Sequence, residues 1–451
     1  MNQKKFMDSI RNIALPVTIQ CLFQAMLGLI DQLMIGHLGS SCIAGVGLGG
    51  KFISLFTVTV SAIVTVAGIL IAQYIGKEDR DGIRRSFHSC MYIAMIVGIL
   101  FLVLSIIIPN QIMGLYSNDK GTIRQAGIYL RIMSAGFIPQ IIALMFSTLL
   151  RNMEAAKYVM YASGLSVISN TILNYLFIFG VGFMPRMDVA GAALATSLAR
   201  IIEMAVVVIM YFRIKNKSKV FRGFYLSFGC RITKDFVKKI AKIIAPILLC
   251  EFLWSLGENV YAVIYGHIGT DSVAAMTLTY PIQTLAIGAL SGVSAAAGII
   301  IGQSLGAKKY EKAYEDSKKI MKLTIFAAVA ICIFVSVIAN LYVNLYNVND
   351  NVKNITVHIL YAYSLVFCAK VVNMVLGGGI LRSGGQTKYI MIVDIVGTWL
   401  IGVPLGLLTS FVLGLPIYIV YFILSLEEYV RMLMEIYLFK SEKWMKNISN
   451  E

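Results

Sequence analysis

The residues of this sequence that could do chemistry are a few carboxylates and amides set inside long apolar stretches. Gln20, Gln24 and Asp31 share one stretch, and Asn170 and Asn174 share another. A carboxylate near the centre of a membrane-spanning helix costs about 2.5 to 3.5 kcal/mol on insertion scales, so the presence of each one calls for a functional or structural explanation. A medium of low dielectric constant favours the neutral form of a carboxyl group, and an incoming proton or cation neutralises it. These residues therefore predict a site that binds a proton or a cation.

The first half of the chain offers one group that can change its charge and several that can assist it. Asn170 and Asn174 are four residues apart, so they share a helix face, and their amides can bind a cation or a carboxyl group. Thr196 adds a hydroxyl. We predict a coupling site of Asp31, Asn170, Asn174 and Thr196. The structural alternatives are a solvated helix-end role for Asp31 and a simple interhelical hydrogen bond for Asn174, worth about 0.6 kcal/mol.

The second half carries Glu251 and Glu258 two helical turns apart, with Trp254 between them on the same face. An aromatic ring beside carboxylates suits an organic cation. Asp394 follows in a later apolar stretch. The alternatives are an ion pair of Glu251 with a lysine or arginine of a neighbouring helix, and a structural tie between helices for Asp394. The predicted substrate site comprises Gln20, Gln24, Glu251, Trp254, Glu258 and Asp394.

The elements that position these residues are membrane-spanning helices. The chain of 451 residues is 58% hydrophobic and 14% charged, with a mean hydropathy of +0.79, whereas soluble domains carry about 25% charged residues. A helix needs about 20 apolar residues to span a bilayer, and the runs are too long and continuous for barrel strands. We predict an all-α polytopic membrane protein with twelve spans near 13–35, 52–75, 91–115, 126–149, 158–180, 189–212, 243–265, 281–305, 320–345, 355–380, 389–411 and 416–439.

The basic residues predict the orientation of these spans. Most of the 39 lysines and arginines fall in the termini and in every second loop, ten of them between Arg213 and Lys242. By the positive-inside rule both termini are then cytoplasmic, in a bacterial inner membrane. A nucleic-acid interpretation of the basic run is weaker than that of a solvated loop facing anionic lipid, so no nucleic-acid partner is expected.

The sequence repeats itself. At an offset of 230, Pro16 matches Pro246 and "IAQYIG" at 71–76 matches "IGQSLG" at 301–306, while "LRNMEAAKYVM" from Leu150 matches "LRSGGQTKYIM" from Leu381 at 231. Each copy holds six spans, so the copies are parallel in the membrane, which is a transporter architecture with a site near the midplane. We predict an N-terminal lobe at 1–212, a cytoplasmic linker at 213–242 and a C-terminal lobe at 243–451.

Several segments carry a resemblance to a known family. "PVTIQCLFQAMLGLIDQLMIGHLG", "LLRNMEAAKYVM", "CEFLWSLGENVYAVIYGHIGTDSVAA", "GIIIGQSLGAKKYEKA" and "GILRSGGQTKYIMIVDIVGTWLIGVPLG" resemble the multidrug and toxic compound extrusion (MATE) family, close to its bacterial DinF-like branch. The resemblance implies two six-helix lobes around a central cleft and alternating access, with export of organic, often cationic, compounds in exchange for protons or sodium ions.

The resemblance also bears on individual residues. It matches Asn170 to an asparagine of the N-lobe ion or proton site, and some members carry aspartate at the position of Asn174. The sodium-coupled NorM branch has an acidic residue where this chain has Val372 or Asn373, which argues against a C-lobe sodium site.

Other functional classes fit less well. A lipid-linked precursor flippase of the same superfamily is the alternative function, but such proteins carry more cations in the cleft than Arg131, Arg200, Lys370 and Arg431 supply. Catalytic signatures are absent from the sequence, the seven cysteines lack ligand spacing, and the glycines of "LGGGILRSGG" suit helix packing better than phosphate binding. We expect a monomer that is not an enzyme and has no metal or cofactor beyond the coupling ion. His37 and His267, at equivalent loop positions of the repeat, are expected to cap loops.

Overall fold

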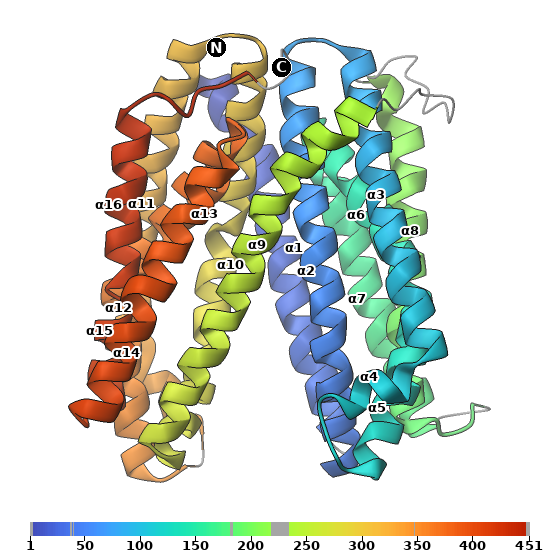
Figure 1. The fold of residues 1–451 in the computed structure, drawn as a ribbon, viewed down its shortest axis with the longest axis vertical. Helices are drawn as coiled ribbons and strands as arrows, with labels where there is room; N and C mark the ends of the chain where they lie inside the picture. Colours follow the sequence, from blue (N-terminus) through green and yellow to red (C-terminus); the bar gives the residue numbers. More distant parts are fainter. Residues whose placement is uncertain are drawn as a thin grey trace. The chain divides into compact units, whose positions relative to one another are not determined.

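The computed structural model describes residues 3–36, 38, 40–180, 184–217, 234–346 and 348–447. It divides into an N-terminal unit of Ile19–Ile240 and a C-terminal unit of Met1–Thr18 with Ala241–Glu451. Within each unit the helices run side by side (Figure 1). The described residues contain helices and turns but no strand, which confirms the predicted all-α fold.

The N-terminal unit contains most of α1 and the helices that follow it up to the predicted linker, of which residues 218–233 lie outside the described residues. Its elements are α1 (Gln3–Gly36), α2 (Ser40–Gly76), α3 (Arg80–Ile107), α4 (Pro109–Gly114), α5 (Lys120–Met133), η1 (Ser134–Gly136), α6 (Phe137–Asn152), α7 (Ala156–Phe179), α8 (Asp188–Ile214) and η2 (Lys215–Lys217).

The C-terminal unit contains the second set of helices and, in addition, the first turns of α1. Thr18 donates a hydrogen bond to the carbonyl oxygen of Ala289 at 3.1 Å, which ties this part of α1 to the unit. Three segments, η3 to η5, are π-helical. The elements are α9 (Lys234–Ile268), α10 (Thr270–Gly306), α11 (Tyr310–Val343), α12 (Asp350–Val375), η3 (Leu376–Leu381), α13 (Thr387–Ile395), η4 (Val396–Gly402), α14 (Val403–Leu407), η5 (Leu408–Val412), α15 (Ile417–Leu424) and α16 (Glu427–Lys440).

Eleven stretches of the described chain are long and apolar enough to cross a membrane. The predicted twelfth span, 416–439, is instead two helices, α15 and α16, separated at Ser425 and Leu426. Each of the two is too short to span a membrane alone, with 8 residues in α15 and 14 in α16, and α16 opens on Glu427 and Glu428. The predicted third span also ends early, at Ile107 rather than residue 115, because Pro109 starts a new helix and disfavours helical geometry just before it.

Helix ends follow local capping rules. The side chains of Asp79, Asp119 and Asn349 accept hydrogen bonds from backbone amides three residues later, as N-cap residues do. The hydrogen bonds at Thr122 lower the pKa of Asp119. At the other end of a helix, α7 stops at Gly180, whose φ of 68° is left-handed and therefore suits glycine.

The repeat is visible in the helix boundaries. Helices α2 and α10 begin at Ser40 and Thr270 and end at Gly76 and Gly306, both at an offset of 230. The starts of α7 and α13 are offset by 231, as the fourth sequence block is. The duplicated sequence therefore folds into duplicated elements with the same register.

Close packing inside the N-terminal unit depends on small residues and stacked rings. A Cβ at Gly191 would lie 2.7 Å from the backbone carbon and oxygen of Phe177, so α8 approaches the end of α7 at glycine distance. The rings of Phe56 and Phe137 stack with centroids 4.1 Å apart. Without a hydrophobic driving force in lipid, such close contacts are what hold helices together.

Replacing Gly191 tests this contact. We expect Gly191→Ala to lower the free energy of unfolding by about 1 to 3 kcal/mol, because the new methyl group meets backbone atoms that cannot rotate away. Gly47→Ala in α2 is the matched control: its Cβ meets nothing within 4 Å, and a better helix former there should stabilise by up to about 1 kcal/mol. Unfolding in mixed micelles measures both. Equal stability of the two variants would contradict the close approach of α7 and α8.

Candidate functional site

A chain of hydrogen bonds links all four predicted coupling residues of the N-terminal unit. Nδ2 of Asn174 donates to Oδ1 of Asp31 at 2.5 Å and to Oδ1 of Asn170 at 2.8 Å. Nδ2 of Asn170 donates to the hydroxyl of Thr196 at 3.1 Å, and Thr196 donates to the carbonyl oxygen of Ala192. The chain joins α1, α7 and α8 and ends on the only group in it that can ionise, Asp31.

The two asparagines are fully enclosed, whereas Asp31 is half-buried. Asn170 and Asn174 are 0% and 1% exposed. Oδ1 of Asn174 is buried and has no hydrogen-bond partner among the described residues. A buried acceptor without a partner is costly, and this one lies on the residue that contacts Asp31. The site therefore offers a carboxylate together with a spare amide oxygen, the oxygen ligands that a proton or a hard cation takes.

An apolar layer covers one side of this chain. Ile35 lies one turn after Asp31, Ile178 one turn after Asn174, and Ala192 one turn before Thr196; the three form a buried cluster. Because α7 and α8 are antiparallel neighbours, these offsets place all three at the same level. This buried cluster closes that side of the hydrogen-bonded chain.

A second polar chain lies three turns away along the same helices. Arg151 donates to Oε1 of Gln20 at 2.7 Å, Nε2 of Gln20 donates to Ser163 at 2.9 Å, and Ser163 donates to Glu203 at 2.7 Å. Gln20 is only 4% exposed and both ends of its amide are used, so its surroundings are those of a helix tie. Gln24, by contrast, is exposed.

In the C-terminal unit, Asp394 belongs to a buried network centred on Arg431. The guanidinium lies 3.5 Å from Oδ1 of Asp394 and 3.8 Å from Oε1 of Glu427, and it donates to the hydroxyl of Thr398. Tyr261 donates to Oε2 of Glu427 at 2.7 Å. Buried charges persist only when they are paired in this way, so the observed surroundings of Asp394 match the structural alternative.

The π-helical segment η4 makes room for this network. A Cβ at Gly397 would meet the side chain of Arg431, and a Cβ at Gly402 would meet the Tyr261 hydroxyl and the Glu427 carboxylate. Single π-helical turns are frequent at functional positions in helices. Here η4 contributes Gly397 and Gly402, which lie against side chains of α9 and α16.

Glu251 has the ion pair that its alternative interpretation requires. Nη1 of Arg382 lies 3.5 Å from Oε1 of Glu251, and the neighbouring Cys250 donates to Oδ2 of Asp394 at 2.6 Å. Trp254 and Glu258 are exposed, Trp254 to 48%. The predicted α9 face thus has one paired carboxylate, one open ring and one open carboxylate.

The sequence reasoning missed the acidic residues of α16. Glu427, Arg431 and Glu435 are four residues apart, so they share a face, and all are buried, as is Glu428. Lys370 lies 3.9 Å from Glu428, to which Asn373 also donates. The signal was in the sequence: charges spaced by four inside an otherwise apolar run indicate a face turned toward protein.

Three other predicted features can be placed. Nowhere in the described residues do three histidine, cysteine, aspartate or glutamate side chains converge as a metal site. His267 lies in the last turn of α9 rather than in the predicted loop, and its ring stacks on Phe411 with centroids 3.8 Å apart. His37 lies outside the described residues.

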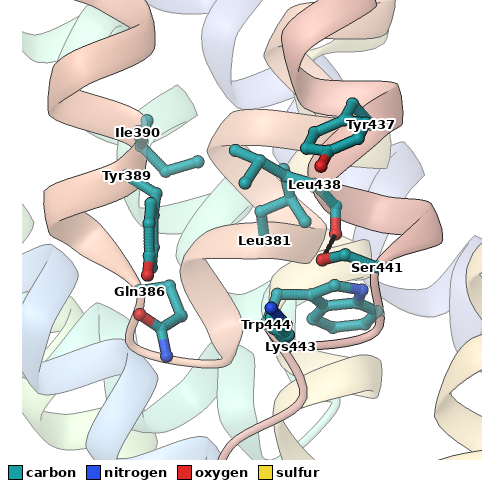
Figure 2. Close-up of a pocket in the computed structure, with 9 residues that line it drawn as sticks. All are labelled: Leu381, Gln386, Tyr389, Ile390, Tyr437, Leu438, Ser441, Lys443 and Trp444. Carbon is teal, nitrogen blue, oxygen red and sulfur yellow. Dashed lines mark hydrogen bonds between the residues drawn. The ribbon is translucent and has the colours of Figure 1, made fainter.

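A cavity of about 180 Å³ lies in the C-terminal unit between the start of α13 and the end of α16. Figure 2 shows the Tyr389 ring on one side of it and Tyr437 and Trp444 on the other. Ser441, at its edge, donates to the carbonyl oxygen of Leu438. Its lining of tyrosines, tryptophan and aliphatic side chains differs from the predicted site residues, so it is a separate feature.

The contact between Asp31 and Asn174 is testable by a double-mutant cycle. For Asp31→Ala and Asn174→Ala, singly and together, we expect a coupling of about 0.6 to 1.7 kcal/mol in the free energy of unfolding, the range for interhelical hydrogen bonds in membranes. Gln24→Ala paired with Asn174→Ala is the control and should be additive. Additivity of the Asp31 pair as well would contradict the hydrogen bond.

Removing the cation of the C-terminal network should be severe. Arg431→Met leaves Asp394 and Glu427 buried without their partner, and we expect a loss of about 3 to 5 kcal/mol of stability. Adding Asp394→Asn and Glu427→Gln should restore part of it, because the uncompensated charges are then gone. Thermal unfolding in detergent measures this series. A triple variant no more stable than Arg431→Met would contradict the pairing.

Comparison with known proteins places the chain in a family. The model of the MatE family matches residues 16–176 and 246–408, one match in each half of the repeat. The chain is 22% identical over 445 residues to the "Uncharacterized transporter YisQ" of Bacillus subtilis, covering 97% of this chain and 95% of that protein. It is 26% identical over 403 residues to a "Probable multidrug resistance protein NorM" of Listeria monocytogenes serotype 4b, covering 88% and 86%.

Solved structures show the same fold. A structure described as the outward-facing conformation of a multidrug resistance MATE family transporter of the MOP superfamily matches with a TM-score of 0.85 at 19% identity, covering 96% of each chain. A crystal structure of MATE in the bent conformation matches with a TM-score of 0.84 at 19% identity, covering 98% of each. With a family model that matches both halves of the repeat and this fold across nearly the whole chain, the protein belongs to the MatE family of multi-pass membrane transporters.

Proposed function

We propose that this protein exports small organic compounds, often cationic, from a bacterial cell by alternating access, in exchange for protons or sodium ions. Membership of a transporter family and relatives described as probable multidrug resistance proteins support the class of function. The single observation that carries the coupling is the hydrogen-bonded chain from Asp31 through Asn174 and Asn170 to Thr196. It surrounds one ionisable group with neutral partners, so the charge of that group is free to change.

Asn174 suits both charge states of Asp31. When Asp31 is ionised, it accepts from the Asn174 amide, as in this structure. When Asp31 is protonated, its hydroxyl can donate to the Asn174 oxygen after the amide turns over, because an amide both donates and accepts. A sodium ion would use the same two oxygens. Asn174 thus offers a donor to the ionised form of Asp31 and an acceptor to the protonated form.

The substrate surface in this proposal is the α9 face of Glu251, Trp254 and Glu258. An exposed indole ring next to carboxylates attracts a flat organic cation by cation–π contact and charge. Glu251 is held by Arg382 at 3.5 Å, so a bound cation competes with that arginine. Such a contact is weak enough to exchange, which transport requires.

The flippase alternative is less well supported by the charges. Lys370 and Arg431, two of the cations that would hold a pyrophosphate, are engaged by Glu428, Asp394 and Glu427. An anion would have to displace these carboxylates from a buried site. Strict dependence of growth on the gene with unchanged drug tolerance would nevertheless favour flipping over efflux.

The experiment is efflux of ethidium from proteoliposomes under a proton gradient and, separately, under a sodium gradient. We expect the wild type to respond to one of the two, Asp31→Asn to lose gradient-driven efflux by at least about tenfold, and Glu251→Gln to bind ethidium more weakly. Asp81→Asn, an exposed carboxylate paired with Arg84 at 2.9 Å, is the control and should transport normally.

Two results would count against the proposal. Undiminished gradient-driven efflux in both Asp31→Asn and Glu251→Gln would remove the assigned residues. A wild-type protein that moves no ethidium or other organic cation under either gradient would remove the function itself.

A further inference from the structure

Glu435 is the most deeply buried carboxylate of the C-terminal unit and has no role in the coupling site of Asp31. It lies in α16 and is 2% exposed. Its Oε2 is buried without a hydrogen-bond partner in the described chain. Its Oε1 lies where a Cβ at Gly377 of η3 would be, so the glycine leaves the space that the carboxyl group fills.

The other four buried or half-buried carboxylates of this region each have a partner, and one further carboxylate, Glu258, is exposed. Glu251 pairs with Arg382, and Glu428 pairs with Lys370 at 3.9 Å. Asp394 and Glu427 share Arg431 and also accept from Cys250 and Tyr261. For Glu435, no lysine, arginine or histidine of the described residues makes an ion pair. We call these five carboxylates and three cations the C-terminal charge cluster; it consists of Glu251, Asp394, Glu427, Glu428, Glu435, Lys370, Arg382 and Arg431.

The cluster has more acids than bases. If all five carboxylates were ionised, three cations would leave two negative charges uncompensated inside the bundle. A buried unpaired charge is far more costly than a neutral, protonated carboxyl group. Glu251 is only half-buried, so part of the excess can be solvated there. Glu435 has no solvent and no ion pair of its own, because the nearby arginines pair with other carboxylates, and a proton is the smallest ion that neutralises it.

The groups around Glu435 explain why a proton fits better than another cation. The turn after η3 contributes Arg382, α13 contributes Asp394, and α16 itself contributes Glu428 and Arg431. Two of these four are cations. A metal ion at Glu435 would be repelled by them and would find a single free carboxylate rather than a cage, whereas a proton needs only one oxygen.

We propose that Glu435 is a proton-binding residue of the C-terminal unit, distinct from Asp31, and that it carries its proton in the state seen here. Its link to transport rests on the proposed function; the binding of the proton does not. When an organic cation reaches the cluster, it supplies the missing positive charge, and Glu435 releases its proton. The cluster then exchanges one monovalent cation for another without a change in net charge.

The first test needs no transport. Infrared difference spectra of the purified full-length protein between neutral and alkaline pH should show the carbonyl stretch of a buried carboxylic acid that disappears at alkaline pH. Glu435→Gln should remove this band. The matched control is Glu311→Gln, an exposed glutamate in the first turn of α11, which should keep it. A band of unchanged size in Glu435→Gln would overturn the proposal.

Two further measurements on folded protein separate the alternatives. Since glutamine mimics a protonated glutamate, Glu435→Gln should melt within a few degrees of the wild type; a loss as large as that of Arg431→Met would show an ion-pair role and overturn the proposal. Sodium chloride added to the wild type at constant pH should leave the band intact. Its loss would show that sodium occupies the site in place of the proton.

The transport arm reports on the link to function. In proteoliposomes that export ethidium, Glu435→Gln should lower the number of protons exchanged per substrate, while Asp31→Asn stops exchange. If the wild type exports nothing, the proposed function fails but the infrared result still decides the proton site. If Glu435→Gln loses the infrared band but keeps the wild-type number of protons per substrate, Glu435 binds a proton but has no role in exchange.

Discussion

The structure of the C-terminal unit depends on one constraint: a charge enclosed by helices in lipid must be matched by another charge or lost. Arg431 meets this constraint for two carboxylates at once, at 3.5 Å from Asp394 and 3.8 Å from Glu427. The surrounding chain is shaped to permit it. The π-helical segment η4 brings Gly397 and Gly402 against these side chains where a Cβ would clash, and α16 is separated from α15 so that its charged face turns inward. In a bilayer, hydrophobic burial does not favour one neighbouring helix over another, so the polar contacts determine which helices lie side by side.

The duplication preserved positions of contact while it changed the residues that make them. In both units an arginine just after the fourth or the tenth predicted span donates to a side chain of α1 or α9, and that side chain donates to the helix that follows the arginine. Each unit has a second contact farther along the same helix. In the N-terminal unit the amide of Asn174 donates to Asp31 of α1, and in the C-terminal unit the hydroxyl of Tyr261 of α9 donates to Glu427. In the N-terminal unit the connecting donors are the amides of Gln20 and Asn174, and in the C-terminal unit they are the thiol of Cys250 and the hydroxyl of Tyr261, both of which donate to carboxylates. The equivalent positions are Gln20 and Cys250, Asp31 and Tyr261, Arg151 and Arg382, Ser163 and Asp394, Thr196 and Glu427, and Arg200 and Arg431.

Local regularity explains what could be predicted from the sequence, and distance along the chain explains what could not. Apolar runs predicted the helices, and a spacing of four predicted that Asn170 and Asn174 face the same way; the structure joins both to Asp31. The separation of α15 from α16 was missed because a hydropathy window averages over a short break. The buried role of Glu435 was missed because its surroundings come from helices that are tens of residues apart in sequence, which no periodicity encodes. Which side chains contact one another therefore depends on how the helices pack.

The two units therefore differ in how they accommodate buried charge. In the N-terminal unit the side chains that form hydrogen bonds with Asp31 are neutral, so gain or loss of its charge leaves no paired ion behind. In the C-terminal unit each of four carboxylates pairs with a cation, so a change of charge at Glu428 leaves Lys370 without its ion pair, and a change at Asp394 or Glu427 leaves Arg431 with one partner instead of two. Such a network resists a change of protonation except at a buried carboxylate outside the ion pairs, and Glu435 is that carboxylate. A unit with many charges can thus have as few exchangeable protons as a unit with one.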